Sequence, residues 1–491
     1  MSAPRTQTRE AGAFFGQPPG LATLFGTELW ERFSYYGMRT LLVLFLTAAV
    51  TDGGLGLSES LAVAIYGVYS AMIYLSALPG GWIADRLLGT RRAVLYGGIT
   101  IAAGHYCMAV PNTALFFVGL VLIMGGTGLL KPNISATVGQ LYGEHDARRD
   151  AGFSLFYMGI NIGAFLSPII CGWLALKVGW HWGFGAAGVG MTIGLIWYVL
   201  GRRHLGDAGI RPGNPATPPE RRRALLFALG ALALIGAYLG VDAATGGINA
   251  NLLINLLTVV AVVVPAVYFW NVLRSPQLTG QERGRMRALV WLFLASAVFW
   301  MIYDQAGSVL NLFAQDRTQR NLLGLNFPAP WFQSVNPLLI IALAPVFAAL
   351  WVRLGSRQPS TPAKFVYALV GIGASFLIMS LAAQAAVGGG RVSPLWLLSV
   401  YFVQTLSELV LSPTGLSVST KLAPAAFSGQ IMGVWFLSTA VGDAVGGQAA
   451  RFIGRLSLPT YFLTLGLVAV VVGALLLVGV PRVRKLMGGV E

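Results

Sequence analysis

The chain has 491 residues, of which 56% are hydrophobic and only 10% are charged. A soluble domain carries about 25% charged residues, so this composition excludes an ordinary aqueous enzyme. The net charge of +15 would suggest nucleic-acid binding in a soluble protein. Here, however, the basic residues stand in short segments between apolar stretches, as in the cytoplasmic loops of membrane proteins. We therefore predict an integral membrane protein that does not bind nucleic acid.

Apolar stretches of about 20 residues, long enough to cross a bilayer as a helix, follow one another in two sets of six with two more between them. After an N-terminal tail at 1–21, the first set forms a bundle over 22–200, with spans at 22–50, 59–84, 92–111, 113–140, 151–176 and 180–200. A linker at 201–221 leads to an inserted helical hairpin over 222–272, with spans at 222–241 and 248–272. The second bundle covers 286–480 and is followed by a tail at 481–491; its spans are 286–313, 329–353, 362–386, 393–421, 427–453 and 458–480. The pattern predicts an all-α membrane protein with 14 transmembrane helices.

The basic residues indicate the orientation of these spans. With the N-terminus inside, the segments on the inner side hold 24 of the 33 Lys and Arg residues, and those on the outer side hold 6. Because positive charges of short loops stay in the cytoplasm, we expect both termini to be cytoplasmic. The N-terminal segment has no apolar signal core, so we expect no cleaved signal peptide. Cys107 and Cys171 lie in apolar stretches and predict neither a disulfide framework nor a thiol active site.

The first span contains charged residues that are costly in lipid. A charge at the centre of a membrane helix costs at least about 2.5 kcal/mol, so such residues normally face the protein interior and have a function. At 100° per residue the polar side chains cover an arc of about 140° on one helix face; they are Glu28, Glu31, Arg32, Tyr35, Tyr36 and Arg39. An intrahelical salt-bridge set that merely offsets its own burial is the alternative.

Three further ionisable residues stand alone in apolar spans: Lys131, Asp304 and Glu408. Since buried unpaired charges are very costly, we expect opposite signs on different helices to meet in the interior. A cavity with carboxylates and cations on opposing walls is typical of a site for a zwitterionic or proton-linked solute. Among the other polar residues, we expect His105 to be a hydrogen-bonded helix residue and Asp443 to make a local polar contact where helices cross.

The residues from Glu28 to Gly37 read ELWERFSYYG. This segment resembles the ExxERFxYYG signature of the proton-coupled oligopeptide transporter (POT) family within the major facilitator superfamily. Two other segments agree with that family, GLLKPNIS at 128–135 and FSLFYMGINIG at 153–163. The segment GWIADR at 81–86 looks like the loop motif of the superfamily, which implies that Asp85 and Arg86 latch helix ends. The resemblance implies the major facilitator fold, in the fourteen-helix arrangement of bacterial members.

The resemblance also implies a site for di- and tripeptides. Arg39 and Lys131 would hold the peptide carboxylate, and Glu408 would hold the amino terminus. Contacts to the peptide backbone would come from Tyr35, Tyr69, Asn161 and Asn336. Pockets for its side chains would be lined by Tyr36, Trp300, Trp435, Phe436 and Ser438, although ordinary helix packing is the alternative for the aromatic residues.

Proton coupling is implied for the acids. Glu28 and Glu31 beside Arg32 and facing Lys131 would change their pairing when protonated. Asp304 facing Arg39 resembles the gating pair of the family, and the family often has Glu at this position, which leaves the distance within the pair open. The expected protein is thus a proton-coupled peptide symporter of the bacterial inner membrane. We expect it to function as a monomer, in the lipid bilayer, with peptides and protons as its partners.

Other functions fit the sequence less well. A membrane-embedded enzyme would need a motif such as HExxH, and the chain has none; Gly126-Thr127-Gly128 lacks the context of a nucleotide-binding loop. Its 4 scattered histidines do not predict a metal site, and we expect no cofactor. A channel would need a continuous lined pore. Within the same family, a carrier of another small solute, such as a modified amino acid or nitrate, is the main alternative.

Overall fold

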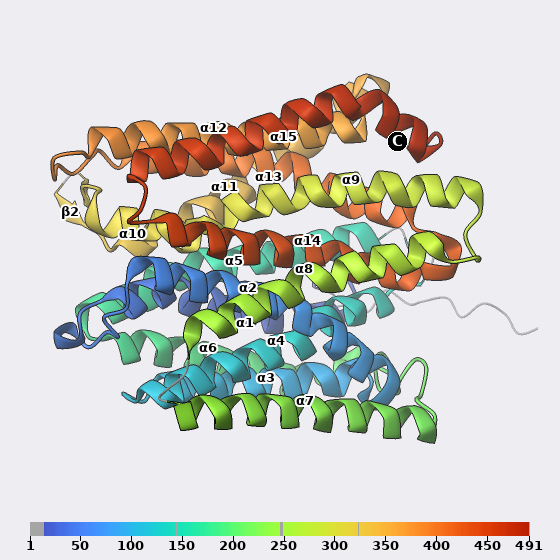
Figure 1. Ribbon diagram of the computed structural model, residues 1–491. Helices are drawn as coiled ribbons and strands as arrows, with labels where there is room; N and C mark the ends of the chain where they lie inside the picture. The colour runs from blue at the N-terminus through green and yellow to red at the C-terminus, as the bar shows by residue number, and fades with distance from the viewer. Residues whose placement is uncertain (1–13, 144–145, 147, 246–248, 323, 491) are drawn as a thin grey trace, which may run out of the picture.

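The computed structural model describes residues 14–143, 146, 148–245, 249–322 and 324–490. Most of the predicted N-terminal tail therefore lies outside the described residues. Long helices make up the described chain (Figure 1); they are α1 (Pro19–Thr47), α2 (Glu59–Ile83), α3 (Thr90–Met108), α4 (Thr113–Gln140), α5 (Arg149–Lys177), α6 (Trp180–Gly201), α7 (Pro218–Thr245), α8 (Ala250–Arg274), α9 (Gly280–Tyr303), α11 (Val335–Leu354), α12 (Thr361–Ala385), α13 (Leu395–Leu422), α14 (Ser428–Ala449) and α15 (Leu458–Met487).

In this part of the chain, 10 helices are long and apolar enough to cross a membrane by length and composition. The helix α1 is not one of them, because it contains Glu28, Glu31, Arg32 and Arg39. These four charges lower its apolar character although the helix has 29 residues. Its burial within the protein therefore matters more for its placement than contact with lipid does.

The helices form two halves, which lie one above the other in Figure 1. In the N-half (α1–α6), α1 packs against α5 and α6, and α3 packs against α4 and α6. In the C-half (α9–α15), α12 packs against α13 and α15, and α9 packs against α14 and α15. The observed arrangement agrees with the two predicted six-helix bundles.

Glycines allow the N-half helices to approach closely. A Cβ atom on Gly80 of α2 would lie 2.0 Å from the backbone oxygen of Gly128 on α4. Likewise, a Cβ on Gly97 of α3 would lie 2.7 Å from the oxygen of Gly126 on α4. Both distances are too short for any side chain, so van der Waals contact between backbones holds these helices together, as is typical of membrane proteins.

The first span of the second set differs from the single helix that the sequence predicted over 286–313. Helix α9 ends at Tyr303, a 3-10 turn follows at Asp304–Gly307, and a short helix, α10 (Val309–Asp316), continues the path. A small antiparallel hairpin, β1 (Asn321–Leu322) and β2 (Leu325–Asn326), comes next and was not expected in an all-α protein. Its strands have two residues each, which is too short for an alternating hydropathy pattern to predict them. The acid Asp304 thus stands at a helix break.

The two inserted helices do not form a closely packed hairpin. Figure 1 shows α7 at the edge of the N-half, whereas α8 lies beside α2 and α14. The amide of Gln448 on α14 donates hydrogen bonds to Asn255 (3.2 Å) and Thr258 (2.8 Å) of α8, and Ile254 packs against α2. Helix α8 therefore contacts both halves, which apolar patterning alone could not show.

The two ends of the molecule differ. We call the end with the α2–α3 turn and residues 202–217 the linker side, and the end with β1 and β2 the β-hairpin side. On the β-hairpin side the halves are hydrogen-bonded: Asn311 donates to the backbone oxygen of Thr40 at 2.7 Å, and Gln333 donates to its hydroxyl at 2.6 Å. Ser334 donates to the oxygen of Phe165 at 2.7 Å. The structure is therefore closed on the β-hairpin side.

Candidate functional site

Three charged side chains of α1 form a buried ion cluster. Glu28, Glu31 and Arg32 are 2%, 0% and 3% exposed. The Nε atom of Arg32 lies 3.0 Å from Glu28 Oε1 and also pairs with Glu31. One cation between two carboxylates leaves an excess negative charge if both acids are ionised. Because an uncompensated buried charge is costly, the cluster needs either a proton or a second cation.

Lys131 of α4 is the nearest candidate for that second cation, but the structure does not bring it into an ion pair with Glu28 or Glu31. Its Nζ atom lies 4.2 Å from the ring centroid of Tyr74 on α2, a cation–π geometry. It interacts with Glu28 and Glu31 electrostatically at longer range. In this structure the ammonium group of Lys131 thus stacks on an aromatic ring and lies within electrostatic range of the two acids.

The predicted gating residues are in direct contact. Arg39 of α1 lies 2.5 Å from Asp304 Oδ1, and the two side chains are 12% and 10% exposed. Arg39 also donates to the hydroxyl of Tyr66 on α2, and its guanidinium group lies over the rings of Tyr36 and Tyr66 at 5.7 and 5.6 Å. The shorter Asp reaches the arginine because it stands at the end of α9, where the helix breaks. This contact joins the two halves.

Glu408 of α13 is oriented by neighbours from the C-half. Its Oε2 atom accepts hydrogen bonds from the Tyr303 hydroxyl at 2.5 Å and from Asn336 at 2.9 Å. Asn336 in turn donates to Thr405 at 3.0 Å. The edge of Trp300 meets the Tyr303 ring, with centroids 5.1 Å apart. In the described part of the chain Oε1 has no such partner, so it is the oxygen that can accept a donor from a solute.

The residues expected to contact a peptide backbone are mostly engaged already. Tyr35 is 5% exposed, meets the edge of Tyr36 and lies under Arg32 at 5.4 Å. Tyr69 is buried, and its hydroxyl has no partner among the described residues. Asn161 donates to the backbone oxygen of the residue one turn earlier in α5, at 2.9 Å.

The residues expected to line side-chain pockets differ in access. Ser438 is buried and shares a hydrogen bond of 2.8 Å with Ser296. Trp435 is buried against Phe365, with ring centroids 6.0 Å apart. Phe436 is 39% exposed. In this conformation Ser438 and Trp435 are therefore packing residues of the C-half rather than open pocket walls.

Known proteins resemble this chain over almost its whole length. The sequence profile of the POT family matches residues 91–463. A di-/tripeptide transporter of Lactococcus lactis subsp. cremoris is 42% identical over 488 residues, which cover 97% of this chain and 98% of that protein. Peptide transporter YePEPT of Yersinia enterocolitica subsp. palearctica serotype O:3 (strain YE-P4) is 39% identical over 502 residues, covering 99% and 98%. The crystal structure of peptide transporter POT in complex with sulfate is 48% identical, with a TM-score of 0.94 and 97% of each chain covered.

The chain belongs to the POT family. It is therefore a multi-pass membrane transporter with the major facilitator fold, and not an enzyme. The predicted membership is confirmed, and the matched region extends from the start of α3 into α15.

The loop motif of this POT protein contacts the linker. The guanidinium group of Arg86 lies 2.5 Å from Glu220 at the start of α7. Two backbone hydrogen bonds join the motif to the linker. The backbone N–H of Asn214 donates to the oxygen of Asp85 at 3.1 Å, and the backbone N–H of Ala216 donates to the oxygen of Arg86 at 2.9 Å. The motif thus attaches the segment after the N-half to the α2–α3 turn, on the linker side.

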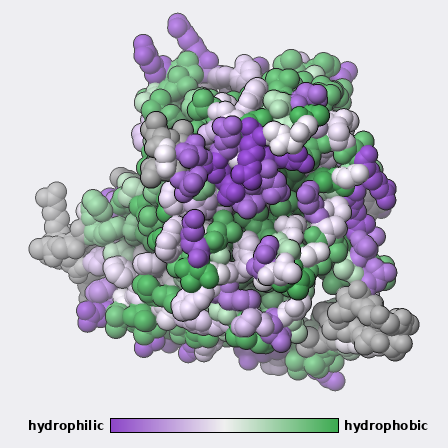
Figure 2. Space-filling model, turned by 90° about the vertical axis from the view of Figure 1, so that its left-hand side faces the viewer, coloured by the Kyte–Doolittle hydropathy of each residue, from purple (hydrophilic) through white to green (hydrophobic). Residues whose placement is uncertain are grey.

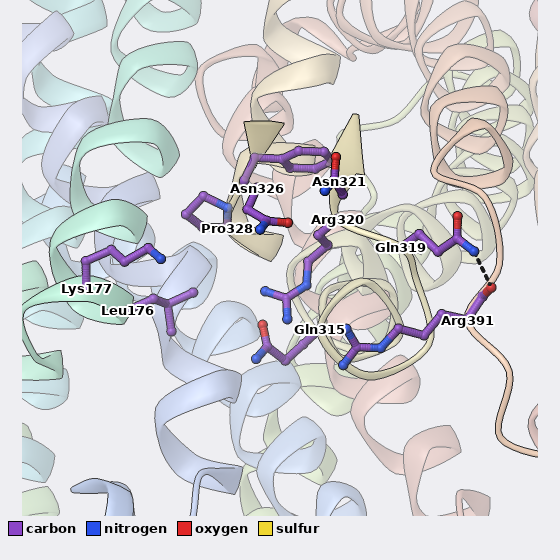
Figure 3. Close-up of a pocket in the computed structure, with 10 residues that line it drawn as sticks. Leu176, Lys177, Gln315, Gln319, Arg320, Asn321, Asn326, Pro328 and Arg391 are labelled. Carbon is purple, nitrogen blue, oxygen red and sulfur yellow. Dashed lines mark hydrogen bonds between the residues drawn. The ribbon is translucent and has the colours of Figure 1, made fainter. Parts of the chain in front are cut away.

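A polar pocket of this POT protein opens on the β-hairpin side, away from the predicted site. Figure 2 shows hydrophilic side chains gathered on this face. Figure 3 shows Lys177 from the N-half, with Arg320 and Arg391 from the C-half, around a pocket of about 500 Å³. Burial and the neighbouring Arg391 lower the pKa of Arg320. The lining is electropositive and comes from both halves, but it contains none of the predicted substrate residues.

Several residues of the POT site were not predicted from the sequence. Three tyrosines contact the charged residues: Tyr66 accepts a hydrogen bond from Arg39, the ring of Tyr74 lies under Lys131, and Tyr303 donates to Glu408. Tyrosines are common in apolar helices, so only their partners on other helices distinguish them. His105 was expected to be hydrogen-bonded; it is instead fully buried, and neither ring nitrogen has a partner among the described residues. Within that part of the chain no group of three His, Cys, Asp or Glu side chains could hold a metal ion.

Proposed function

We propose that this protein is a proton-coupled symporter that imports di- and tripeptides by alternating access. The main observation is the placement of opposite charges in the two halves. Arg39 and Lys131 belong to the N-half, whereas Glu408 in the C-half has one carboxyl oxygen open. A short peptide has a carboxylate at one end and an ammonium group at the other. Cations in one half and an acid in the other half can therefore bind both ends. The names of the related di-/tripeptide and peptide transporters support this substrate class.

The ion cluster of α1 supports proton coupling. Glu28 and Glu31 compete for Arg32, and Lys131 lies within electrostatic reach. Protonation of one carboxylate weakens its attraction for Arg32 and Lys131, so that the charge of Lys131 becomes available to the peptide carboxylate. An ion pair at 4 Å is worth about 4 kcal/mol at an effective dielectric constant of 20. A change of a few kcal/mol is sufficient to shift a two-state equilibrium.

The orientation follows from the positive-inside rule. The linker side holds most basic residues, including Arg86, Arg91, Arg202 and Arg203, so we place it and both termini in the cytoplasm of a bacterial cell. The β-hairpin side then faces outward and is closed in this structure by Arg39 and Asp304. Opening that side, and closing the other, would expose the site to the outside. No contact with another copy is needed for this scheme, so we propose that the monomer is functional.

The proposal can be tested with purified protein in liposomes. Uptake of labelled dialanine should rise with an inward proton gradient and collapse when an ionophore dissipates that gradient. Accumulation without a gradient would rule out symport. Competition by unlabelled dipeptides, but not by nitrate or single amino acids, should separate peptide transport from the transport of another small solute.

The substitution Glu31→Gln tests the coupling step. It should abolish gradient-driven accumulation and spare peptide counterflow, because a neutral amide mimics the protonated acid without being able to release a proton. Glu59→Gln, at the N-terminus of α2 and away from the cluster, is the control and should behave like the unsubstituted protein. If Glu31→Gln also lost counterflow, the role of Glu31 would be in binding or structure.

A further inference from the structure

Three basic side chains line the pocket on the β-hairpin side, and they come from both halves. Lys177 is the last residue of α5 in the N-half, whereas Arg320 and Arg391 lie in loops of the C-half. All three extend toward the same space in Figure 3. None of them forms an ion pair with a residue that the structure describes, and the described lining of the pocket contains no acid. The pocket therefore holds positive charge without a counter-ion.

Backbone hydrogen bonds fix the two arginines close together. The N–H of Gln319 donates to the oxygen of Val392 at 2.8 Å, and the N–H of Val392 donates to the oxygen of Arg317 at 2.9 Å. The side-chain amide of Gln319 donates to the backbone oxygen of Arg391 at 3.2 Å, drawn as the dashed line in Figure 3. These bonds join the segment after α10 to the α12–α13 loop. Neighbouring like charges oppose each other's ionisation, and Arg391 together with burial lowers the pKa of Arg320.

Two polar atoms at this pocket lack partners. Arg320 Nε and Gln315 Oε1 are buried, and neither has a hydrogen-bond partner among the described residues. Both side chains line the pocket. A buried polar group without a partner is costly. A guanidinium group binds carboxylate and phosphate oxygens particularly well, while an amide oxygen can accept from a hydroxyl group. The lining thus suits an anion that also carries a hydroxyl group.

The acids nearby do not neutralise this region. Asp316, at the end of α10, acts on Arg320 and Arg391 only through longer-range electrostatics. Asp316 and Glu59 of α2 also interact with Arg317 in this way. Including the lysine of the pocket, the four cations exceed the two acids by two charges. A dianion would therefore neutralise the region, whereas a monovalent anion would not.

The pocket exists in full only while the halves meet. Trp331 donates from Nε1 to the backbone oxygen of Ile169 on α5 at 3.2 Å, and its ring stacks on Phe327 with centroids 6.4 Å apart. These contacts attach the segment after β2 to the helix that ends at Lys177. The volume of about 500 Å³ is typical of a small-molecule site. Separation of the halves would remove Lys177 from the arginines and divide the site.

We propose that this pocket binds a small hydroxylated dianion, a phosphate monoester or a hydroxy dicarboxylate, and that the bound anion stabilises the closed β-hairpin side. Closure brings Lys177 toward Arg320 and Arg391, and the anion offsets the repulsion among them. Because the anion contacts both halves only in the closed protein, it binds that conformation more tightly and shifts the equilibrium toward it. The pocket opens on the hydrophilic face in Figure 2, so the anion comes from solution rather than from a lipid.

Binding can be measured by calorimetry on the full chain in phosphatidylcholine nanodiscs, at constant ionic strength set with chloride. Glycerol 3-phosphate and malate are the probes, and we expect saturable binding. Arg320→Gln and Arg391→Gln should each raise the dissociation constant about tenfold or more, because each removes a hydrogen bond to a charged group. Arg455→Gln is the matched control: it removes an exposed arginine from the α14–α15 loop, outside the pocket. No saturable binding of either probe, or unchanged binding in both pocket variants, would overturn the inference.

The conformational effect needs a second measurement. Spin labels at Val50→Cys and Val387→Cys, exposed residues near the ends of α1 and α12, report the distance across the β-hairpin side in a background without the native cysteines. At ten times its dissociation constant, glycerol 3-phosphate should raise the ratio of closed to open protein about tenfold. Lys177→Gln should raise this ratio without any anion, because the repulsion is reduced, and should weaken the response to the anion. An unchanged ratio, or a shift toward the open protein, would contradict the proposal.

A lipid headgroup is the other source of a phosphate group. Nanodiscs that contain phosphatidylglycerol, without added anion, should leave the ratio of closed to open protein unchanged. If this lipid closed the protein and glycerol 3-phosphate did not, the pocket would be a lipid site and the proposal of a soluble anion would fail. Neither measurement contains peptide, so failure of the anion site leaves the proposed peptide transport untested by it, and failure of peptide uptake in liposomes leaves the anion site standing.

Discussion

Glu408 is the acid for which the structure makes the most specific binding prediction. Tyr303 and Asn336 fix one oxygen and leave the other open, so a peptide ammonium group would complete its coordination. A hydrogen bond to a charged group contributes about 1.5–3 kcal/mol, and about 1.4 kcal/mol changes a dissociation constant tenfold. Glu408→Gln should therefore raise the KM for dialanine about 10- to 100-fold. N-acetylated dialanine, which has no ammonium group, should be affected much less.

Uptake of the two peptides by the same liposome preparation is the measurement. Glu59→Gln is again the control and should change neither KM. Equal losses for the free and the acetylated peptide would contradict the assigned role and would indicate that Glu408 maintains the local structure through Tyr303 and Asn336.

Helix α4 shows how closely two elements must approach to place Lys131. A Cβ on Gly128 would lie 2.6 Å from the backbone oxygen of Ser76 on α2, whereas nothing lies within 4 Å of a Cβ on Gly125. Overpacking of this kind costs about 1–3 kcal/mol. Gly128→Ala should lower the melting temperature of the protein in detergent, and Gly125→Ala, one turn away on the same helix, should leave it nearly unchanged.

Because Tyr74 and Ser76 share the same turn of α2, a shift of α4 would also move Lys131 away from the Tyr74 ring. Gly128→Ala should therefore weaken peptide binding as well. A variant that bound peptide normally at full thermal stability would show that the α2–α4 contact does not position the lysine.

The proposed transport cycle requires the halves of the whole molecule to separate on the β-hairpin side. The side chains of Thr40 and Gln333 are hydrogen-bonded across this contact, so a short bifunctional methanethiosulfonate, which replaces the length of the glutamine, should cross-link cysteines at both positions. We expect the cross-link to stop peptide uptake and a reducing agent to restore it. Cysteines at Thr90 and Thr137, whose hydroxyls lie 2.9 Å apart within the N-half, are the control pair. Full uptake with the Thr40–Gln333 pair cross-linked would mean that this contact does not open.

Much of the architecture followed from the sequence, because apolar length and the cost of charge in lipid are local properties. The spans at 59–84 and 113–140, for example, match α2 and α4 to within one residue. Helix ends were less certain: α15 continues to Met487, where Gly488 adopts a left-handed conformation, beyond the expected end at 480. The residues of the α1 motif were enough for the family to be recognised.

The sequence by itself thus determined the class of protein, the succession of helices and the charged residues that must avoid lipid. Only the tertiary structure decided their surroundings: the Tyr74 ring for Lys131, one small pocket for Asp304 and Asp443, and both halves for α8. The physical reason is that these contacts join residues far apart in the chain. They depend on how closely whole helices pack, through glycines and a helix break at Asp304, and hydrophobic periodicity carries no information about which helices become neighbours.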